Sequence, residues 1–187
     1  MKQPRQHRPP HLYISKADYF FTITTYHHQP FLNTTYKKDL LLSIVKQSLK
    51  AEGFILTGWV ILDNHMHLLV MVNDSVRLPK FIARITGKSA IELNKLEGKQ
   101  NCPLRAVGSH RKIWYQYWDR CIRDEKDFYI RLNYIHFNPV KHRYVAQPGL
   151  YSYSSYQEYL NKYGEEWLNG CFIKYPVKEF TPEKGME

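Results

Sequence analysis

The 187-residue chain lacks the features that mark membrane, secreted and zinc-finger proteins. It contains no run of about 18 apolar residues, which argues against a transmembrane helix. Its basic, proline-rich N-terminus has no apolar segment of the kind found in a secretory signal. The cysteines number three and are widely spaced, so they form neither a disulfide framework nor a zinc-finger pattern. These absences predict a cytoplasmic protein that has no membrane partner.

Acidic residues are also scarce in this chain. Asp and Glu total 17 against 27 Lys and Arg, which gives a net charge of +10. Residues 157–187 hold six acids and four lysines, so residues 1–156 carry +12. A body this basic attracts polyanions, because each neutralised phosphate releases condensed counterions. Charge alone leaves a nucleic-acid partner and an ordinary basic surface as alternatives. The 15 tyrosines and four tryptophans favour the first, because aromatic rings stack on unpaired bases.

The hydrophobic content of 43% is enough for one folded domain. We expect a flexible basic arm over residues 1–16, a domain over residues 17–156 and an irregular C-terminal tail over residues 157–187. The apolar pattern predicts strands at 18–26, 54–62, 65–72 and 113–118, and helices at 34–50, 77–97 and 124–137. Pro139 is expected to stop the last helix. This order predicts an α+β fold, a ferredoxin-like split βαβ with a central antiparallel sheet and helices packed on one of its faces.

Two histidines stand out in the second half of the predicted hairpin. His65 and His67 are two residues apart on a strand, so their side chains point to the same face while Met66 points to the other. Two neighbouring imidazoles can hold one divalent cation when their nitrogens are unprotonated. The alternative is a pair of surface or hydrogen-bonded core histidines without any ligand.

The predicted helix at 124–137 carries a second set of polar groups. Tyr134 and Asn138 are four residues apart and share one stripe, which Arg131 borders. We expect this stripe to form an exposed flank. A different stripe, formed by Phe128, Leu132 and Ile135, would face the core. The alternative for Tyr134 is an ordinary surface tyrosine whose hydroxyl meets water.

Taken together, these segments resemble a known family. The relevant stretches are WVILDNHMH at 59–67, IW at 113–114, WD at 118–119 and NYIHFNPVKH at 133–142. Their order and separation resemble the HUH single-tyrosine transposases and nucleases, and most closely the REP-associated tyrosine transposases, which are relatives of the small insertion-sequence transposases. The resemblance covers about residues 17–156. Many insertion-sequence members have glutamine as the third metal ligand, whereas this chain has Asn138. In this shorter side chain the sequence resembles the REP-associated branch.

The resemblance implies an HUH endonuclease fold and a metal-dependent single-strand DNA endonuclease and strand transferase. Mg²⁺ or Mn²⁺ would be held by His65, His67 and Asn138 and would polarise the scissile phosphate. Tyr134 would attack phosphorus and form a 5′-phosphotyrosine, leaving a free 3′-hydroxyl. The substrate would be single-stranded DNA folded into a hairpin like a repetitive extragenic palindrome, which predicts association with the nucleoid. Monomer and homodimer both remain open. The general base is not identified, because His136 and Arg131 are candidates on spacing alone.

Basic and aromatic residues along the chain are candidate DNA contacts. The cations of the predicted helix at 77–97 are spaced three, four, four and seven residues apart and so lie along one side of it. They form either a stripe that follows DNA phosphates or an ordinary solvated face. Trp118 and its aromatic neighbours are candidates for base stacking, although we expect at least two of these rings to lie in the core. The predicted contacts are Arg5, Arg8, Arg77, Lys80, Arg84, Lys88, Arg111, Lys112, Trp114 and Arg131.

Alternatives remain for the function and for the tail. A catalytically inactive module that binds DNA hairpins would show the same motifs. A zinc hydrolase built on His65 and His67 would require a third ligand, and the sequence shows no pattern that supplies one. The acidic tail either completes the fold or lies against the basic body and competes with DNA.

Overall fold

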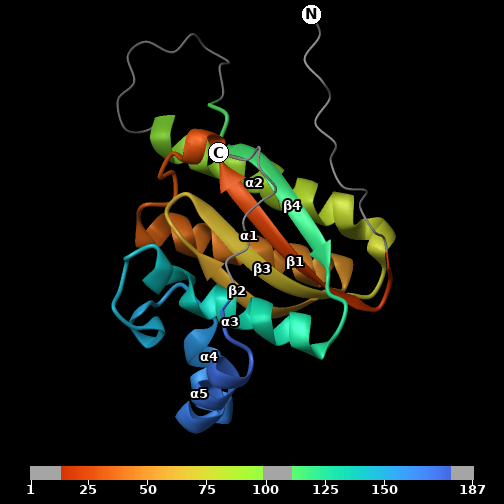
Figure 1. Cartoon of the computed structure of the whole chain (residues 1–187). Coiled ribbons are helices and arrows are strands. Elements are labelled where there is room, and N and C mark those ends of the chain that lie inside the picture. Colours follow the sequence, from red (N-terminus) through yellow and green to blue (C-terminus); the bar gives the residue numbers. More distant parts are fainter. Residues whose placement is uncertain (1–13, 99–110, 178–187) are drawn as a thin grey trace, which may run out of the picture.

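The computed structural model describes residues 14–98 and 111–177 (Figure 1). Its four-stranded antiparallel sheet has the order β2-β3-β1-β4. The strands are β1 (Ala17–Thr25), β2 (Ile55–Ile61), β3 (His65–Val72) and β4 (Trp114–Cys121). The helices are α1 (Thr35–Glu52), α2 (Leu78–Gly98), α3 (Glu125–Lys141), α4 (Tyr156–Tyr163) and α5 (Glu165–Lys174). Short 3₁₀ turns lie at Tyr26–His28, Ser75–Arg77 and Pro148–Leu150. The order from β1 to β4 confirms the predicted ferredoxin-like split βαβ arrangement.

The two faces of the sheet are covered by different helices (Figure 1). Along β3, Met66 and Leu68 pack in a core with α1 and α2, whereas Leu69 packs with α3 on the opposite face. The predicted placement of helices on one face therefore holds for α1 and α2, and α3 is added on the other face. The same alternation turns His65 and His67 toward α3.

Local signals explain the bounds of α1, the helix that precedes the hairpin. Thr34 caps its first turn, because the Thr34 hydroxyl accepts a hydrogen bond of 3.3 Å from the backbone N–H of Lys37. Gly53 ends the helix in the left-handed region, with φ of 70°, which a residue without Cβ adopts at little cost. Buried Leu41, Val45 and Leu49 recur every four residues and face the sheet.

Gly58 lets α3 approach the sheet closely. It lies beside an irregularity in the pairing of β2 with β3. A Cβ atom at this position would stand 3.0 Å from Cδ1 of Leu132 on α3 and 3.4 Å from Cβ of Leu69 on β3. The missing side chain therefore sets the separation between α3 and the strands that carry the histidines.

α3 is longer than the sequence pattern predicts. Asp124 caps its first turn by accepting from the backbone N–H of Asp127 at 2.8 Å. The helix then passes through Pro139 and ends at Lys141, so the prediction that Pro139 stops it is wrong. A proline this close to a C-terminus deprives only the carbonyl of Ile135 of its helical donor, and the last turn continues around it. Asn138 thereby stays helical and stays on the stripe of Tyr134.

The expected irregular tail is also wrong over its described part. It forms α4 and α5, which pack against α3 (Figure 1). The Asn133 amide of α3 donates to the backbone oxygens of Cys171 at 2.9 Å and Tyr175 at 2.7 Å. Up to residue 177 this segment therefore completes the fold. Within the described ranges, none of the helices has the length and apolar character that crossing a membrane requires.

Candidate functional site

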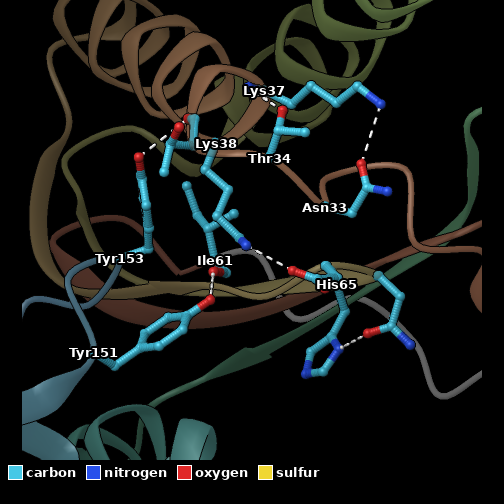
Figure 2. A network of polar contacts seen from close by, with 11 residues as sticks. Asn33, Thr34, Lys37, Lys38, Ile61, His65, Tyr151 and Tyr153 are labelled. Atoms are coloured by element: carbon cyan, nitrogen blue, oxygen red, sulfur yellow. Dashed lines mark hydrogen bonds and ion pairs between the residues drawn. The ribbon is translucent and has the colours of Figure 1, made fainter. Parts of the chain in front are cut away.

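His65 and His67 lie together beneath α3, and each ring is oriented by a hydrogen bond. Their side chains are buried and their ring centroids are 5.0 Å apart. Nδ1 of His65 lies 2.7 Å from the amide oxygen of Asn64, and Nδ1 of His67 lies 2.9 Å from the Thr22 hydroxyl (the His65 bond is drawn in Figure 2). Because an amide oxygen only accepts, Nδ1 of His65 carries the proton and Nε2 keeps its lone pair.

The turn that carries Asn64 is itself anchored. Nζ of Lys38 on α1 forms an ion pair with Asp63 at 2.6 Å (Figure 2). The backbone N–H of Thr25 and its hydroxyl both donate to the Asn64 carbonyl at 2.9 Å. Tyr151 donates its hydroxyl to the backbone oxygen of Ile61 at 2.8 Å, just before the turn. These contacts tie the turn to α1, β1 and the segment after α3, so the orientation of the His65 ring is fixed from several sides.

α3 brings Tyr134 and Asn138 to the same two histidines. Asn138 Oδ1 lies 3.2 Å from Nε2 of His65, and the Tyr134 ring centroid lies 5.2 Å from that of His67. The structure therefore brings together all four residues that the motifs single out. The predicted exposed flank is wrong, because Asn138 is 0% exposed and Arg131 is 1% exposed. The stripe faces the sheet, and Phe128 lies only partly buried at the edge of the core where Leu132 and Ile135 are fully buried.

Burial keeps both histidines neutral. Burial lowers the pKa of His65 to about 4, and the positive charges that His142 and Lys141 carry when protonated act in the same direction. The pKa of His67 lies well below its ordinary value for the same reason, with His65 and His142 as the next contributors. At neutral pH both Nε2 atoms therefore offer unprotonated lone pairs, which is the state that metal coordination requires.

Polar atoms at the centre of this site fit a divalent cation. Among the described residues Nε2 of His67, which is buried, finds no hydrogen-bond partner. Nε2 of His65 and Oδ1 of Asn138 are both acceptors in this arrangement, and they face each other at 3.2 Å. Two facing lone pairs repel unless a positive group lies near both, and a metal ion would satisfy all three atoms. No group of three His, Cys, Asp or Glu side chains suited to a metal occurs in residues 14–98 and 111–177, so a zinc hydrolase finds no third ligand there.

Two further residues border the site, and sequence reasoning did not assign them to it. The ring centroid of His142 lies 4.9 Å from that of His65, and Nζ of Lys141 lies 5.3 Å from the Tyr134 ring centroid. Both follow Asn138 by one helical turn, and that spacing is the signal that points to them. Thr22 was also missed, because its role depends on the pairing of β1 with β3 and not on any local pattern.

His136 lies on the far side of α3 from Tyr134, because residues two apart on a helix point in nearly opposite directions. It is completely buried, and its Nε2 lies 3.0 Å from the Ser155 hydroxyl. Burial lowers the pKa of His136 to about 3. The residue therefore joins α3 to the segment before α4 and does not face the site.

The predicted basic stripe lies away from the histidines. Lys80, Arg84 and Lys88 lie on α2, on the opposite face of the sheet, and Arg77 directly precedes that helix. Arg84 forms an ion pair of 3.0 Å with the buried carboxylate of Glu52, and Arg77 pairs with a neighbouring aspartate. The structure therefore does not bring this group of cations to the candidate site.

The remaining predicted DNA contacts divide into buried and surface residues. Trp114 is 8% exposed and donates its Nε1–H to the Ser89 hydroxyl at 2.9 Å, so its predicted role in stacking is wrong. Arg131 is equally unsuited to a surface contact, since it is buried beside Asp127, with Nε 3.2 Å from that carboxylate. Arg111 lies over the Phe31 ring and Lys112 over the Tyr26 ring, near the start of β4. Arg5 and Arg8 lie outside the described residues.

Comparisons with known proteins agree on one group. Residues 13–136 match the model of a family described as IS200-like transposases. A putative REP-associated tyrosine transposase of Haemophilus influenzae is 31% identical over 157 residues, covering 80% of this chain and 86% of that protein. The REP-associated tyrosine transposase of Escherichia coli K12 is 28% identical over 144 residues, covering 77% and 79%. The solved structure of a REP-associated tyrosine transposase bound to a REP hairpin is 22% identical and superposes with a TM-score of 0.62 over 98% of this chain and 96% of that chain, which shows a shared fold.

Proposed function

This chain belongs to the IS200-like transposases, and within them to the REP-associated tyrosine transposases; from this we propose that it cleaves and rejoins single-stranded DNA at hairpins through Tyr134. The observation that carries the proposal is the convergence of Tyr134 and Asn138 of α3 with His65 and His67 of β3. A nucleophile beside a set of unprotonated donors is the arrangement that phosphoryl transfer to a side chain requires.

The proposed metal donors are Nε2 of His65, Nε2 of His67 and Oδ1 of Asn138. An amide oxygen is a hard ligand, which favours Mg²⁺ or Mn²⁺. When bound, such an ion stabilises the negative charge that develops on the scissile phosphate. The chain's own contribution is orientation, because Asn64 and Thr22 hold the two Nδ1 atoms and thereby aim both Nε2 atoms at α3.

Tyr134 is the proposed nucleophile. Its phenolic oxygen forms a bond to phosphorus while the bond from phosphorus to the 3′ oxygen breaks, which leaves a 5′-phosphotyrosine and a free 3′-hydroxyl. Attack by another 3′-hydroxyl reverses the step and joins a different strand without an external energy source. A free phenol has a pKa near ~10, so the Tyr134 proton must leave as the new bond forms. The ammonium of Lys141, 5.3 Å from the ring centroid, supplies positive charge beside the incoming phosphate.

The proposed substrate follows from the relatives and from charge. The protein solved with a REP hairpin binds that DNA, and we extend this substrate class to the present chain. The charge of +12 on residues 1–156 suits a polyanion, and a DNA substrate would place the protein at the nucleoid. The site is built from a single chain, and this supports a monomer that uses its own tyrosine.

The test is a covalent-adduct assay. The protein is incubated with an end-labelled hairpin oligonucleotide that carries a single-stranded foot, with Mn²⁺ or with EDTA. We expect a denaturation-resistant adduct with Mn²⁺, none with EDTA, and none with Tyr134→Phe. Tight binding without an adduct in the wild-type protein would contradict the proposal and would support a module that binds hairpins without cleaving them.

A further inference from the structure

The sheet face that carries the candidate site is only partly covered. α3 packs on β2, on β3 and on the ring of Phe20 in β1, whereas the rest of β1 and β4 form the remaining part of this face (Figure 1). Thr22 pairs with Trp118 across β1 and β4, and Thr24 pairs with Gln116. Directly paired residues project to the same side, and the Thr22 hydroxyl reaches His67. Trp118 and Gln116 therefore lie on the site-bearing face, with intermediate exposure.

Trp118 packs differently from Trp114, Tyr117 and Cys121 of β4. Its neighbours Tyr117 and Cys121 pack against the core formed with α1 and α2. As far as the described residues go, Trp118 is part of neither core cluster. An indole is the largest apolar side chain, and a tryptophan on a partly exposed sheet surface offers a flat ring for contact with a partner. Its placement therefore points to a ligand that uses ring stacking.

The distance between Trp118 and the candidate metal ligands suits one nucleotide. Thr22 on β1 lies between Trp118 on β4 and His67 on β3. Neighbouring strands are about 4.8 Å apart, so the backbones at Trp118 and His67 are separated by about 10 Å. A nucleotide whose phosphate lies at the histidines can reach Trp118 with its base. At the other end of this half-face, Arg120 lies 3.9 Å from Asp127 of α3 and closes the surface.

We propose that Trp118 stacks on the base of the nucleotide next to the phosphate that Tyr134 attacks, so that single-stranded DNA crosses the open half of the sheet. This inference rests on the proposed function. Single-stranded DNA is the occupant because its bases are unstacked, whereas duplex DNA hides its base faces. The polar side chains of Thr24 and Gln116 along the same path offer hydrogen-bonding groups to the strand. The surface is continuous with the candidate site and belongs to the basic part of the chain.

The test is a double-mutant cycle between Trp118 and a single base. A series of hairpin oligonucleotides carries one abasic site, moved position by position along the single-stranded foot. Binding to the full chain is measured by fluorescence anisotropy in EDTA, so that no cleavage occurs. We expect Trp118→Ala to weaken binding of the intact oligonucleotide about 5- to 150-fold, the range for one base–aromatic stack. When the abasic site removes the base that stacks on Trp118, the wild type and Trp118→Ala should bind the oligonucleotide with equal affinity. Trp118→Phe, which keeps an aromatic ring, should retain most of the affinity for the intact oligonucleotide.

A matched control lies on the same strand. Tyr115 is 53% exposed, lies at the irregularity in the pairing of β1 with β4, and has its ring centroid 6.3 Å from that of Tyr26. We expect Tyr115→Ala to show no coupling to the abasic position that couples to Trp118. Equal losses for intact and abasic oligonucleotides at every position, or no loss in Trp118→Ala, would overturn the inference. Adduct formation by the wild type is measured separately. A covalent adduct without coupling between Trp118 and any base refutes only the stacking. Coupling without a covalent adduct refutes only the proposed cleavage.

Discussion

Thr22→Val tests whether the outer hydrogen bond to His67 sets the metal affinity of the site. The Thr22 hydroxyl lies 2.9 Å from Nδ1 of His67, and valine has nearly the same shape without the hydroxyl. In the tautomer that leaves Nε2 free to bind metal, Nδ1 donates this hydrogen bond. The substitution leaves a buried N–H without its acceptor and allows the ring to rotate away from its orientation toward α3.

The expected loss follows from the kind of partner removed. Outer-shell partners of ligating histidines are worth about 10- to 100-fold in metal affinity. This corresponds to about 1.4–2.7 kcal/mol of binding free energy. The unpaired Nδ1–H also lowers the free energy of unfolding without metal, by about 1–3 kcal/mol, because the ring is only 4% exposed.

The assay is a Mn²⁺ titration of the full chain, followed by the electron paramagnetic resonance signal of free Mn²⁺. Thr22→Ser keeps a hydroxyl that can accept the hydrogen bond from Nδ1 of His67. Its affinity for Mn²⁺ should therefore stay within about threefold of that of the wild type. Thr24→Val is the matched control, since Thr24 lies on the same face and its hydroxyl donates to the backbone oxygen of Gln116, at 3.4 Å, and not to a histidine. Equal Mn²⁺ affinity for Thr22→Val and the wild type would refute the assigned role of Thr22.

Two further predictions concern stability. Burial gives native His136 a pKa of about 3 against an ordinary 6.5, so between these values the native state binds fewer protons than the unfolded state. Stability is therefore complete above about pH 6.5 and falls on acidification, by about 2 kcal/mol at pH 5 from this residue. His136→Gln, which can still bond Ser155, should show a shallower loss in urea unfolding at pH 7.5 and 5, and an unchanged slope would contradict the assignment. Gly58→Ala should lower the free energy of unfolding by about 1–2 kcal/mol, because the new Cβ would crowd Leu132. Gly87→Ala should raise the free energy of unfolding by about 1 kcal/mol, because a Cβ at this helical position would meet no atom beyond the adjoining helix backbone within 4 Å. Equal effects of the two substitutions would refute the packing argument.

Local periodicity was enough to predict the central part of the site. Strand alternation predicted that His65 and His67 share a face, and helical spacing predicted that Tyr134 and Asn138 share a stripe. Both rules involve residues close in sequence, which is why they succeed. Thr22 was not assigned, and Trp118 was only one of several stacking candidates with no predicted place near the histidines. Thr22 pairs with His67 across 45 residues and with Trp118 across 96, and no local pattern encodes that register.

The errors on α3 have a common cause. Its sequence is rich in polar residues, so the stripe with Arg131 was expected to face water. The chain buries this guanidinium beside Asp127, one helical turn earlier, and over the ring of Phe20. Pro139 was expected to end the helix, but Asn138 and Pro139 are both buried against the rest of the fold, and this packing favours the last turn. Tertiary packing overrode a local preference in both cases.

The hydrogen bonds of Asn133 have a consequence for how the tyrosine helix can move. Because the Asn133 amide adjoins Tyr134 and donates to two carbonyls at the end of α5, the segment of α3 that carries Tyr134 is tethered by the last described helix. Any exchange of α3 between two copies would have to carry α4 and α5 with it or break both bonds. A chain shortened after residue 156 would lose both hydrogen bonds. The position of the Tyr134 hydroxyl therefore depends on α5 as well as on the sheet.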